Sequence, residues 1–340
     1  MVNDSDTLEY ANRRVVAALQ VNPRAGVGEI ARILGEHERT VARRVQRLAD
    51  SRAIRPTATY DVMRCGLGNS VGLRLQAAPG ALEKTAQALA EHPELRTVLA
   101  LCGRSSTLWC ETLLPYGSRL HTLMAEGIPG LPGLPDITLV EAHFTLKTFT
   151  TEASWHVPLL APDERRQLLA SMVQPLADLA DHYELTPTDR RVADALAEDA
   201  RISLTDLSRR FGFSVATAGR RVSSLLERRM IQLRTEIEPA LLGHPFEAQL
   251  HLKVGPAGLD HVGAELAGCP EVRYCAAVTG TSNLLVQVCV ESEAHLYRFL
   301  GERLGALPQI TEVATELVVH AFKRGSVLKD GVLAAHPNQP

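Results

Sequence analysis

The sequence predicts an α+β fold that is built twice along one chain. Three observations support this prediction. A stretch that begins at Arg13 returns at Arg190, 177 positions further on (190 − 13). In both copies, short helical patterns joined by a glycine come before runs of strand-like alternation. The interval is also long enough for each copy to contain complete domains, so the repeat is not a solenoid unit.

Composition indicates a soluble globular protein. The chain has 340 residues, 45% of them apolar, and single cores stop growing near ~250–300 residues, so we expect more than one core. No apolar run approaches the ~18 residues of a membrane span, and no signal peptide is recognisable, which predicts a cytoplasmic protein without membrane contact. The six cysteines form no CxxC pair and are expected to be reduced and mostly buried. The net charge of −3 means that any surface for nucleic acid must be local.

The second copy begins with three helices whose starts can be identified. Thr186 can cap the first helix, and Pro187 suits its first position. Ser203 opens a short second helix, and Gly212 supplies a turn that needs left-handed backbone angles. Ser214 caps a third, arginine-bearing helix. Two helices joined by a glycine turn in this way are typical of a helix-turn-helix domain, whose last helix enters the major groove of DNA.

The first copy repeats this scheme around Gly35, with arginines at matching places of its third helix. Arginine near a helix start can bind guanine O6 and N7, and arginine farther along meets phosphates. Because the spacing recurs in both copies, we interpret these side chains as a DNA-binding surface rather than as solvated helix faces. The predicted DNA-binding residues are Arg39, Thr40, Arg43, Arg44, Arg47, Ser214, Thr217, Arg220 and Arg221.

The two third helices differ at the end that would read bases. The first starts with His37, Glu38 and Arg39, and the second starts with Ser214 followed by valine and alanine. We therefore predict either that the two domains prefer different half-sites or that one of them contributes mainly phosphate contacts.

A second repeated pattern follows each helix-turn-helix, and it has the order βαββαβ. The later copy reads as strand Phe246 to Val254, helix Leu259 to Leu266, strands Val272 to Val278 and Leu284 to Val290, helix Ala294 to Leu304 and strand Ile310 to Phe322. The earlier copy follows the same order from Val71 to Phe149, with its second helix over Leu120 to Ala125. This order makes a ferredoxin-like sandwich whose open sheet face needs a cover, which we expect to be the sister sheet or another chain.

The sequence predicts six segments, and two of them, a linker and a tail, lie outside these modules. The predicted limits are 5–55 and 186–234 for the winged or helix-turn-helix domains, 64–150 and 242–324 for the ferredoxin-like domains, 151–185 for a helical linker and 325–340 for a disordered tail. Asp163 to Asp181 reads as an amphipathic helix that either spans the two halves or packs on one of them.

The order of helix-turn-helix, linking strand and βαββαβ module resembles the leucine-responsive/AsnC (feast/famine) family of transcription regulators. The matching stretches are Asp189 to Arg234 and Phe246 to Lys323. The resemblance implies a regulator that binds double-stranded DNA at an affinity set by a small effector, such as an amino acid, or by assembly state. It also implies that this chain is equivalent to two fused subunits, which would form an intrachain pseudo-dimer and a homo-oligomer.

The predicted effector site departs from the family. The resemblance places it in the glycine-containing turn between the second and third strands, where family members often have an acidic residue. Here the candidates are Gly103, Ser105, Gly280, Thr281 and Ser282, and neither turn contains a carboxylate. A carboxylate is the natural partner of an α-ammonium group, so the alternative that these are simple hairpin turns stays open.

The sequence gives no positive sign of an enzyme. We expect no catalytic residues, no metal site and no cofactor, because no nucleophile–base pair or phosphate loop is visible and His92, His143, His251 and His261 match no metal-ligand spacing. The alternative is a siroheme decarboxylase, an enzyme class with similar domains and a characteristic His-Asn-Tyr stretch. At the corresponding places this chain has Thr97-Val98-Leu99 and Tyr274-Cys275-Ala276.

Overall fold

The computed structural model describes residues 7–78, 80–102, 106–115, 137–177, 179 and 182–329. The chain divides into two compact units. One, the helical unit, consists of Met1–Gly66 and Glu152–Gly243, and the other, the sheet unit, consists of Leu67–Thr151 and His244–Pro340. The chain therefore alternates between the units, and each unit contains one module from either half of the sequence.

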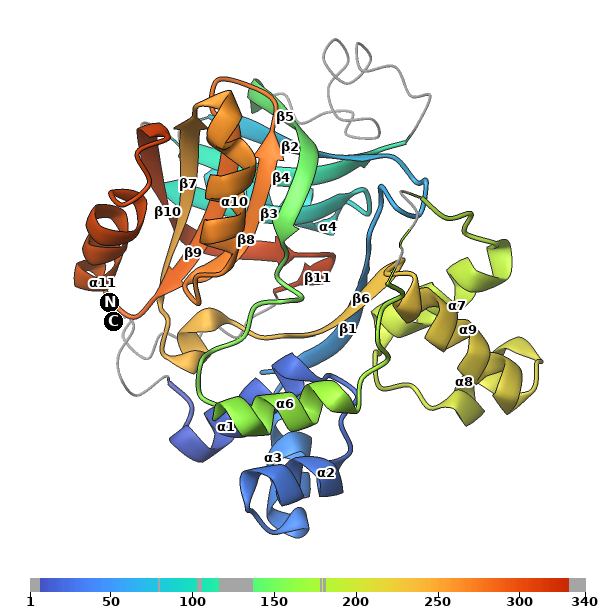
Figure 1. Ribbon diagram of the computed structural model, residues 1–340. Helices are drawn as coiled ribbons and strands as arrows, with labels where there is room; N and C mark the ends of the chain where they lie inside the picture. Colours follow the sequence, from blue (N-terminus) through green and yellow to red (C-terminus); the bar gives the residue numbers. More distant parts are fainter. Residues whose placement is uncertain are drawn as a thin grey trace. The chain divides into compact units, whose positions relative to one another are not determined.

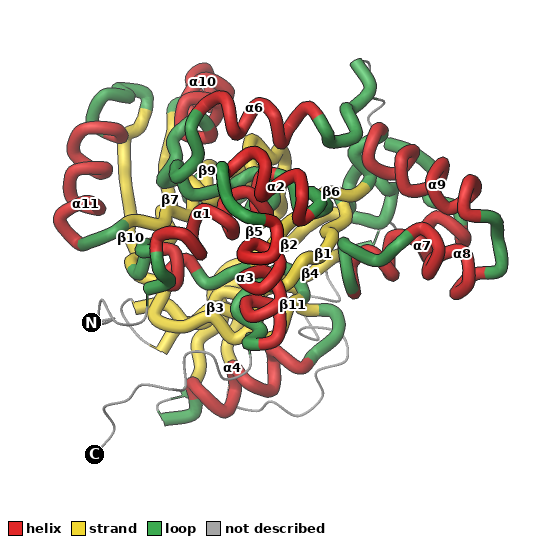
Figure 2. Tube along the Cα trace, turned by 90° about the horizontal axis from the view of Figure 1, so that it is seen from below, coloured by secondary structure: helices red, strands yellow, loops and turns green. Residues whose placement is uncertain are grey.

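The helical unit contains two helix-turn-helix domains, each of three helices (Figures 1 and 2). The first domain consists of α1 (Tyr10–Val21), α2 (Val27–Leu34) and α3 (Glu38–Asp50), and the second of α7 (Pro187–Glu198), α8 (Leu204–Phe211) and α9 (Val215–Glu227). The predicted turn glycines, Gly35 and Gly212, have φ of 70° and 74°, which explains why a residue without Cβ is needed there.

The two domains begin their helices differently. In the second domain, the side chains of Thr186, Ser203 and Ser214 each accept a hydrogen bond from the backbone N–H three residues later, as the sequence predicts. In the first domain, the three N-cap positions hold Glu9, Gly26 and His37, and none makes a side-chain cap. The second domain therefore has the better-defined helix starts.

A pseudo-twofold relation joins the two domains inside the helical unit. Strand β1 (Arg55–Tyr60) pairs antiparallel with β6 (Ile231–Glu236), and Thr57 lies opposite Arg234, its counterpart 177 positions later. Arg24 donates to the carbonyl oxygens of Ala200 and Ile202. Arg201, again 177 positions from Arg24, donates to the carbonyl oxygen of Pro23 at 2.7 Å. These reciprocal contacts fix the two domains with respect to each other.

The helix of the linking segment packs on the first domain, whereas the residues after it reach the second domain, where the Leu176 N–H donates to the Glu227 carbonyl at 2.9 Å. This helix, α6, covers only Pro162–Ala170, so the predicted helix to Asp181 is wrong in length. Leu168 is fully buried, and Arg14 and Asn22 of the first domain contact the helix through Glu164 and the Leu168 carbonyl. A longer helix would include Pro175, whose ring removes a backbone donor and disfavours helix before it.

The sheet unit contains two modules: a complete βαββαβ module from the second half of the chain, and one from the first half whose described elements follow the order βαβββ. The first module has β2 (Asn69–Ala77), α4 (Leu82–Glu91), β3 (Leu95–Cys102), β4 (Ser106–Leu114) and β5 (Ile137–Thr150). The second module has β7 (Phe246–Val254), α10 (Leu259–Ala267), β8 (Val272–Val278), β9 (Leu284–Val290), α11 (Glu293–Arg298, continued by a π-helical turn to Leu304) and β10 (Ile310–Arg324). The helix predicted over Leu120 to Ala125 lies outside the described residues.

The two modules share one closed sheet. The strand order is β10-β3-β4-β2-β5-β8-β9-β7, and β7 pairs with β10 again, so the long last strand of each module adds to the other module's edge (Figure 1). We expected a second sheet to cover the open face, and the cover is the sister module. The two modules are joined by hydrogen bonds between their edge strands as well as by packing of their sheet faces. The pairing leaves fewer unpaired strand edges than two separate sheets would have.

Each face of the closed sheet has its own core. On the helix side, two separate apolar clusters centre on Leu73 and Leu89 in the first module and on Leu250 and Phe299 in the second. On the enclosed side, Leu99, Trp109 and Leu285 form a third apolar cluster. Polar side chains lie beside this third cluster, inside the sheet. Because a buried polar group needs a hydrogen-bond partner, these polar side chains are expected to contact one another.

Several smaller expectations can be compared with the structure. The predicted tail is partly ordered, because β11 (Val327–Leu328) pairs with the end of β10, whereas residues 330–340 lie outside the described part. All six cysteines are free thiols, four of them buried, one intermediate and one, Cys102, exposed. Within the described ranges, no helix is both long enough and apolar enough to pass through a membrane.

Candidate functional site

The third helix of the first domain presents a row of arginines. Arg39, Arg43 and Arg47 follow one another at intervals of four on α3, and all three are exposed. Residues at this spacing share one helix face, so their guanidinium groups form a continuous positive strip. Thr40, at the edge of the strip, is half-buried.

The third helices share two arginines at matching positions, and one of these, Arg44 in the first copy and Arg221 in the second, is paired within its own domain. Arg44 contacts Glu36 at 2.9 Å, and Arg221 contacts Asp189 at 2.6 Å. The two acids are not counterparts of each other, so each domain has evolved a separate partner. These ion pairs link the third helix of each domain to the rest of that domain.

The third helix of the second domain presents a less charged surface. Arg220 is exposed, whereas Thr217 is half-buried and lies 3.3 Å from the Arg220 guanidinium. The Ser214 oxygen is used as the helix cap, since it accepts from the backbone N–H of Thr217 at 3.1 Å. Val215 beside it is 45% exposed, which leaves an apolar group at the helix start.

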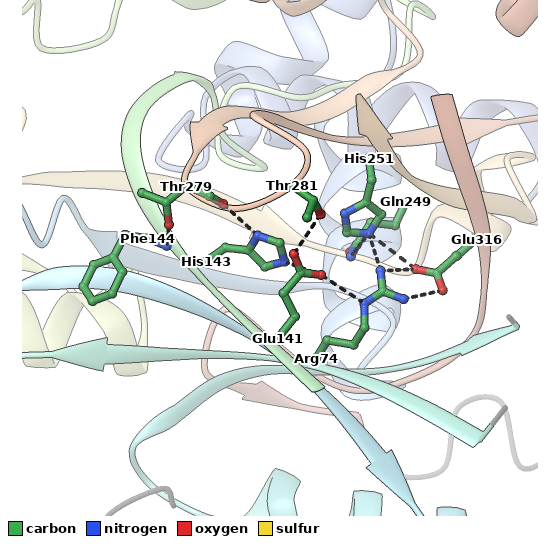
Figure 3. Close-up of polar contacts among 9 residues, drawn as sticks. All are labelled: Arg74, Glu141, His143, Phe144, Gln249, His251, Thr279, Thr281 and Glu316. Atoms are coloured by element: carbon green, nitrogen blue, oxygen red, sulfur yellow. Dashed lines mark hydrogen bonds and ion pairs between the residues drawn. The ribbon is translucent and has the colours of Figure 1, made fainter. Parts of the chain in front are cut away.

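The predicted effector turn contacts the other module. Gly280, Thr281 and Ser282 lie in the turn between β8 and β9, and Gly103 and Ser105 lie outside the described residues. The Thr281 hydroxyl donates to Glu141 Oε1 at 3.2 Å, and the Thr279 carbonyl lies 2.9 Å from His143 Nδ1 (Figure 3). The turn itself has no carboxylate, but strand β5 of the first module brings Glu141 to it.

The contact between this turn and strand β5 requires a residue without a side chain at position 280. The φ of Gly280 is +114°, and an added Cβ would lie 2.8 Å from His143 Nδ1 and 3.2 Å from Glu141 Oε1. We expect Gly280→Ala to lower the free energy of unfolding by about 1–3 kcal/mol, because the backbone is strained and the turn must move away from β5. Urea denaturation measures this. Gly26→Ala is the matched control, since φ there is −68° and the added Cβ has no neighbour within 4 Å. Equal losses in both variants would contradict the expectation.

A buried polar cluster continues from Glu141 into the enclosed face of the sheet (Figure 3). Arg74 of β2 binds both oxygens of Glu316 of β10 at 2.6 and 2.7 Å, and its Nη2 lies 2.9 Å from His251 Nε2 of β7. The Trp109 ring packs against both His143 and His251, with centroid distances of 5.5 and 5.9 Å. We call the set Arg74, Glu141, His143, Gln249, His251 and Glu316 the polar cluster.

The polar cluster strongly lowers the pKa of the Glu316 carboxyl group. Burial raises the pKa of this carboxyl, but hydrogen bonds from His251 and Arg74 outweigh burial and hold the pKa at about 2. A lowered folded-state pKa stabilises the protein above the unfolded value of about 4.3, and the contribution is lost as pH falls towards 2. We therefore expect the stability advantage of the native chain over Glu316→Gln to shrink between about pH 5 and pH 3. Urea denaturation at each pH measures it, and a constant difference would contradict the assignment.

Sequence reading missed the polar cluster. Each histidine was compared only with metal-ligand spacing along the sequence, which does not reveal partners on other strands. One signal was available. Arg74 and His251 are counterparts, 177 positions apart, on strands of alternating polarity, so both face the same side of the sheet.

Comparison with known proteins identifies the family. The Lrp/AsnC ligand-binding domain matches residues 247–328, and the AsnC-type helix-turn-helix domain matches residues 12–49 and again 185–226. A leucine-responsive regulatory protein of Rhizobium meliloti is 31% identical over 144 residues, which are 41% of this chain and 92% of that protein. The chain belongs to the Lrp/AsnC family. An uncharacterized HTH-type transcriptional regulator of Pyrococcus horikoshii is also 31% identical, over 42% of this Lrp/AsnC chain and 90% of the relative.

Solved structures that align with nearly the whole Lrp/AsnC chain correct the expectation that this protein is not an enzyme. The siroheme decarboxylase NirDL has a TM-score of 0.57 at 14% identity, over 96% of this chain and 99% of that one. A second structure of NirDL, in complex with an iron-uroporphyrin III analogue, has a TM-score of 0.55 at 15% identity, over 93% of each chain. The sequence-based exclusion of an enzyme is therefore wrong, because the four-module arrangement exists in an enzyme. At this identity the similarity establishes the shared fold.

The helix-turn-helix model matches both helical domains of this Lrp/AsnC protein, and the ligand-binding model matches the second sheet module. The first module has the same strand order, with a buried Trp109 and the polar residues Arg74 and His143 on its enclosed face.

Proposed function

We propose that this protein is a sequence-specific DNA-binding transcription regulator. The observation that carries the proposal is the presence of two AsnC-type helix-turn-helix domains, each of which exposes arginine on its third helix. Relatives over 90% or more of their length are named as transcriptional regulators. Exposed guanidinium groups suit phosphates and guanine edges, and a helix of this kind fits the major groove.

We further propose that the two domains contact DNA unequally. The α3 strip of Arg39, Arg43 and Arg47 supplies most of the electrostatic attraction, whereas α9 offers Arg220 beside the exposed Val215. Arginine prefers guanine, and an apolar side chain prefers the thymine methyl group. The preferred operator then has two different halves, with centres one helical turn apart (about 34–36 Å) or a multiple of it.

The chain acts, in this proposal, as two family subunits fused in tandem. The reciprocal Arg24 and Arg201 contacts and the β1–β6 pair support an intrachain pseudo-dimer. We also propose that several chains assemble and that the protein acts in the cytoplasm. An effector would bind at the turn of Gly280, Thr281 and Ser282. Glu141 beside that turn supports a ligand that carries a positive charge.

Selection of DNA from fragmented genomic and random pools tests the proposal. We expect the intact chain to enrich sequences with one shared, asymmetric motif, and we expect affinity to fall steeply as salt rises. Calorimetry against an amino-acid panel tests the effector separately. Failure to retain any DNA at low ionic strength would overturn the regulator, whatever the calorimetry shows.

A siroheme-type enzyme is the second candidate. The whole-chain similarity to siroheme decarboxylase favours it, as does an enclosed site with two histidines and an arginine, which suits a ring that carries carboxylates. Titration with siroheme, followed by visible absorbance, discriminates between the two. Saturable binding with turnover would support the enzyme, and an unchanged spectrum would reject it.

A further inference from the structure

The strand that follows each helix-turn-helix domain lies on the other domain. Strand β1 leaves the first domain and packs along α7 of the second, where the Thr57 hydroxyl donates to the Ala197 carbonyl at 2.6 Å. Strand β6 leaves the second domain and packs along α1 of the first, where the Thr235 hydroxyl donates to the Leu19 carbonyl at 2.7 Å. The two domains have therefore exchanged strands, and a rotation of one domain against the other must disturb these contacts.

Two arginines join the domains from opposite sides. Arg24, in the loop between α1 and α2, donates to the carbonyl oxygens of Ala200 and Ile202 at 2.7 and 3.2 Å. Arg201, in the matching loop between α7 and α8, donates to the Pro23 carbonyl at 2.7 Å. A guanidinium group is planar and its donors point in fixed directions, so these bonds define an orientation as well as a contact. We call Arg24 and Arg201 the arginine clasp.

The arginine clasp brings two like charges close together. Burial lowers the pKa of the Arg24 guanidinium, and the positive charge of Arg201 lowers it further, while Asp199 opposes both effects. The position that matches Asp199 in the first half, 177 residues earlier, holds the neutral Asn22. An apolar pair of similar size would join the domains at least as strongly as two half-buried cations. This composition suits the selection of one geometry better than a gain in stability.

We propose that Arg24 and Arg201 are positioning residues that fix the distance between α3 and α9, and so restrict the chain to operators with a single half-site spacing. The inference rests on the proposed DNA-binding function, because α3 and α9 are the helices that enter the major groove there. DNA makes one turn in about 10–10.5 base pairs, so five additional base pairs move the second half-site to the opposite side of the duplex. Domains held by the arginine clasp cannot follow that change. Neither arginine needs to touch DNA for this role.

The distance between two spin labels tests the fixed geometry in the intact chain without DNA. Labels are introduced as non-canonical amino acids at Ala49 on α3 and at Arg228 directly after α9, both of which are exposed. We expect one narrow distance distribution with the arginine clasp intact, and a broader distribution in the clasp variant Arg24→Ala/Arg201→Ala. A broad distribution before any clasp substitution, or an unchanged narrow one in the clasp variant, would overturn the inference.

A matched control separates the arginine clasp from general charge. The control variant Arg166→Ala/Arg209→Ala removes the same two charges from the helical unit, from side chains that are 75% and 74% exposed. We expect it to keep the narrow distribution. Equal broadening in the clasp and control variants would contradict a specific role of Arg24 and Arg201.

Binding to duplexes of different spacing measures the consequence for DNA. We expect five base pairs inserted between the half-sites of the selected operator to lower the affinity of the native chain about a hundredfold, because only one domain can then bind. In the clasp variant the same insertion should lower affinity about tenfold or less, because its domains can adjust. The control variant should respond as the native chain does.

The outcomes of this binding experiment distinguish the two proposals. If no duplex binds at low ionic strength, the proposed function fails. If duplexes bind but the native chain tolerates the insertion, the inference about the arginine clasp fails alone. If the clasp variant does not fold, the distance distribution of the native chain and its response to the insertion still decide.

Discussion

Simultaneous replacement of Arg39, Arg43 and Arg47 by alanine is expected to weaken binding to the selected DNA by at least about a hundredfold. The three guanidinium groups share one exposed face of α3 and belong to three of the four arginines of that helix. Each contact of this kind contributes about 1–3 kcal/mol, and a factor of ten corresponds to 1.4 kcal/mol. Fluorescence anisotropy with the selected duplex measures the change.

Salt dependence shows whether these arginines meet phosphates. Each phosphate contact that is lost should lower the slope of log affinity against log salt concentration by about 0.9. The matched control is the triple alanine variant at Arg166, Arg298 and Arg303, which removes the same charge from exposed positions outside α3. If both triple variants lose affinity equally, general charge and not the α3 surface is responsible.

Arg74→Leu is expected to destabilise the sheet unit by about 3–5 kcal/mol, the usual cost of breaking a buried ion pair by removing one partner. The substitution leaves Glu316, with a side chain only 12% exposed, without its bidentate cation, and it removes the guanidinium group that lies 4.0 Å from Glu141. Chemical denaturation, followed by the fluorescence of Trp109 and by circular dichroism, measures the loss.

A double variant separates charge from packing. Arg74→Leu combined with Glu316→Leu removes both members of the pair, and it should recover much of the lost stability, because two apolar side chains satisfy an enclosed site better than one unpaired carboxylate does. A single variant as stable as the native chain would show that water reaches Glu316 and that the pair contributes little.

Local signals were sufficient for the helix-turn-helix domains. Thr186, Ser203 and Ser214 each combine a hydroxyl with the correct spacing from the first helical turn, and Gly35 and Gly212 mark the turns. These features depend on a few neighbouring residues and are readable from a short window of sequence. The end of α6 before Pro175 could have been predicted in the same way, because proline disfavours helix in the residues before it.

The polar cluster depends on contacts that no short window contains. Arg74, His251 and Glu316 come from three strands that meet only when β7 and β10 close the sheet with the first module. A histidine in an alternating strand has many possible neighbours, and only the register of the strands selects one. The carboxylate beside the turn between β8 and β9 was equally hidden, because Glu141 reaches this turn from the other half of the chain.

The pairing of Arg74 with His251 has a consequence for how such a chain can diverge. The two residues occupy the same place in the two copies, 177 positions apart, and they touch at 2.9 Å across the internal axis. Two separate, identical polypeptides would have to put arginine against arginine or histidine against histidine there, since one gene would encode both sides. Covalent linkage of the copies removes that restriction. A donor and its acceptor can then be inherited as different residues, and the interior of the sheet unit is free to become chemically asymmetric.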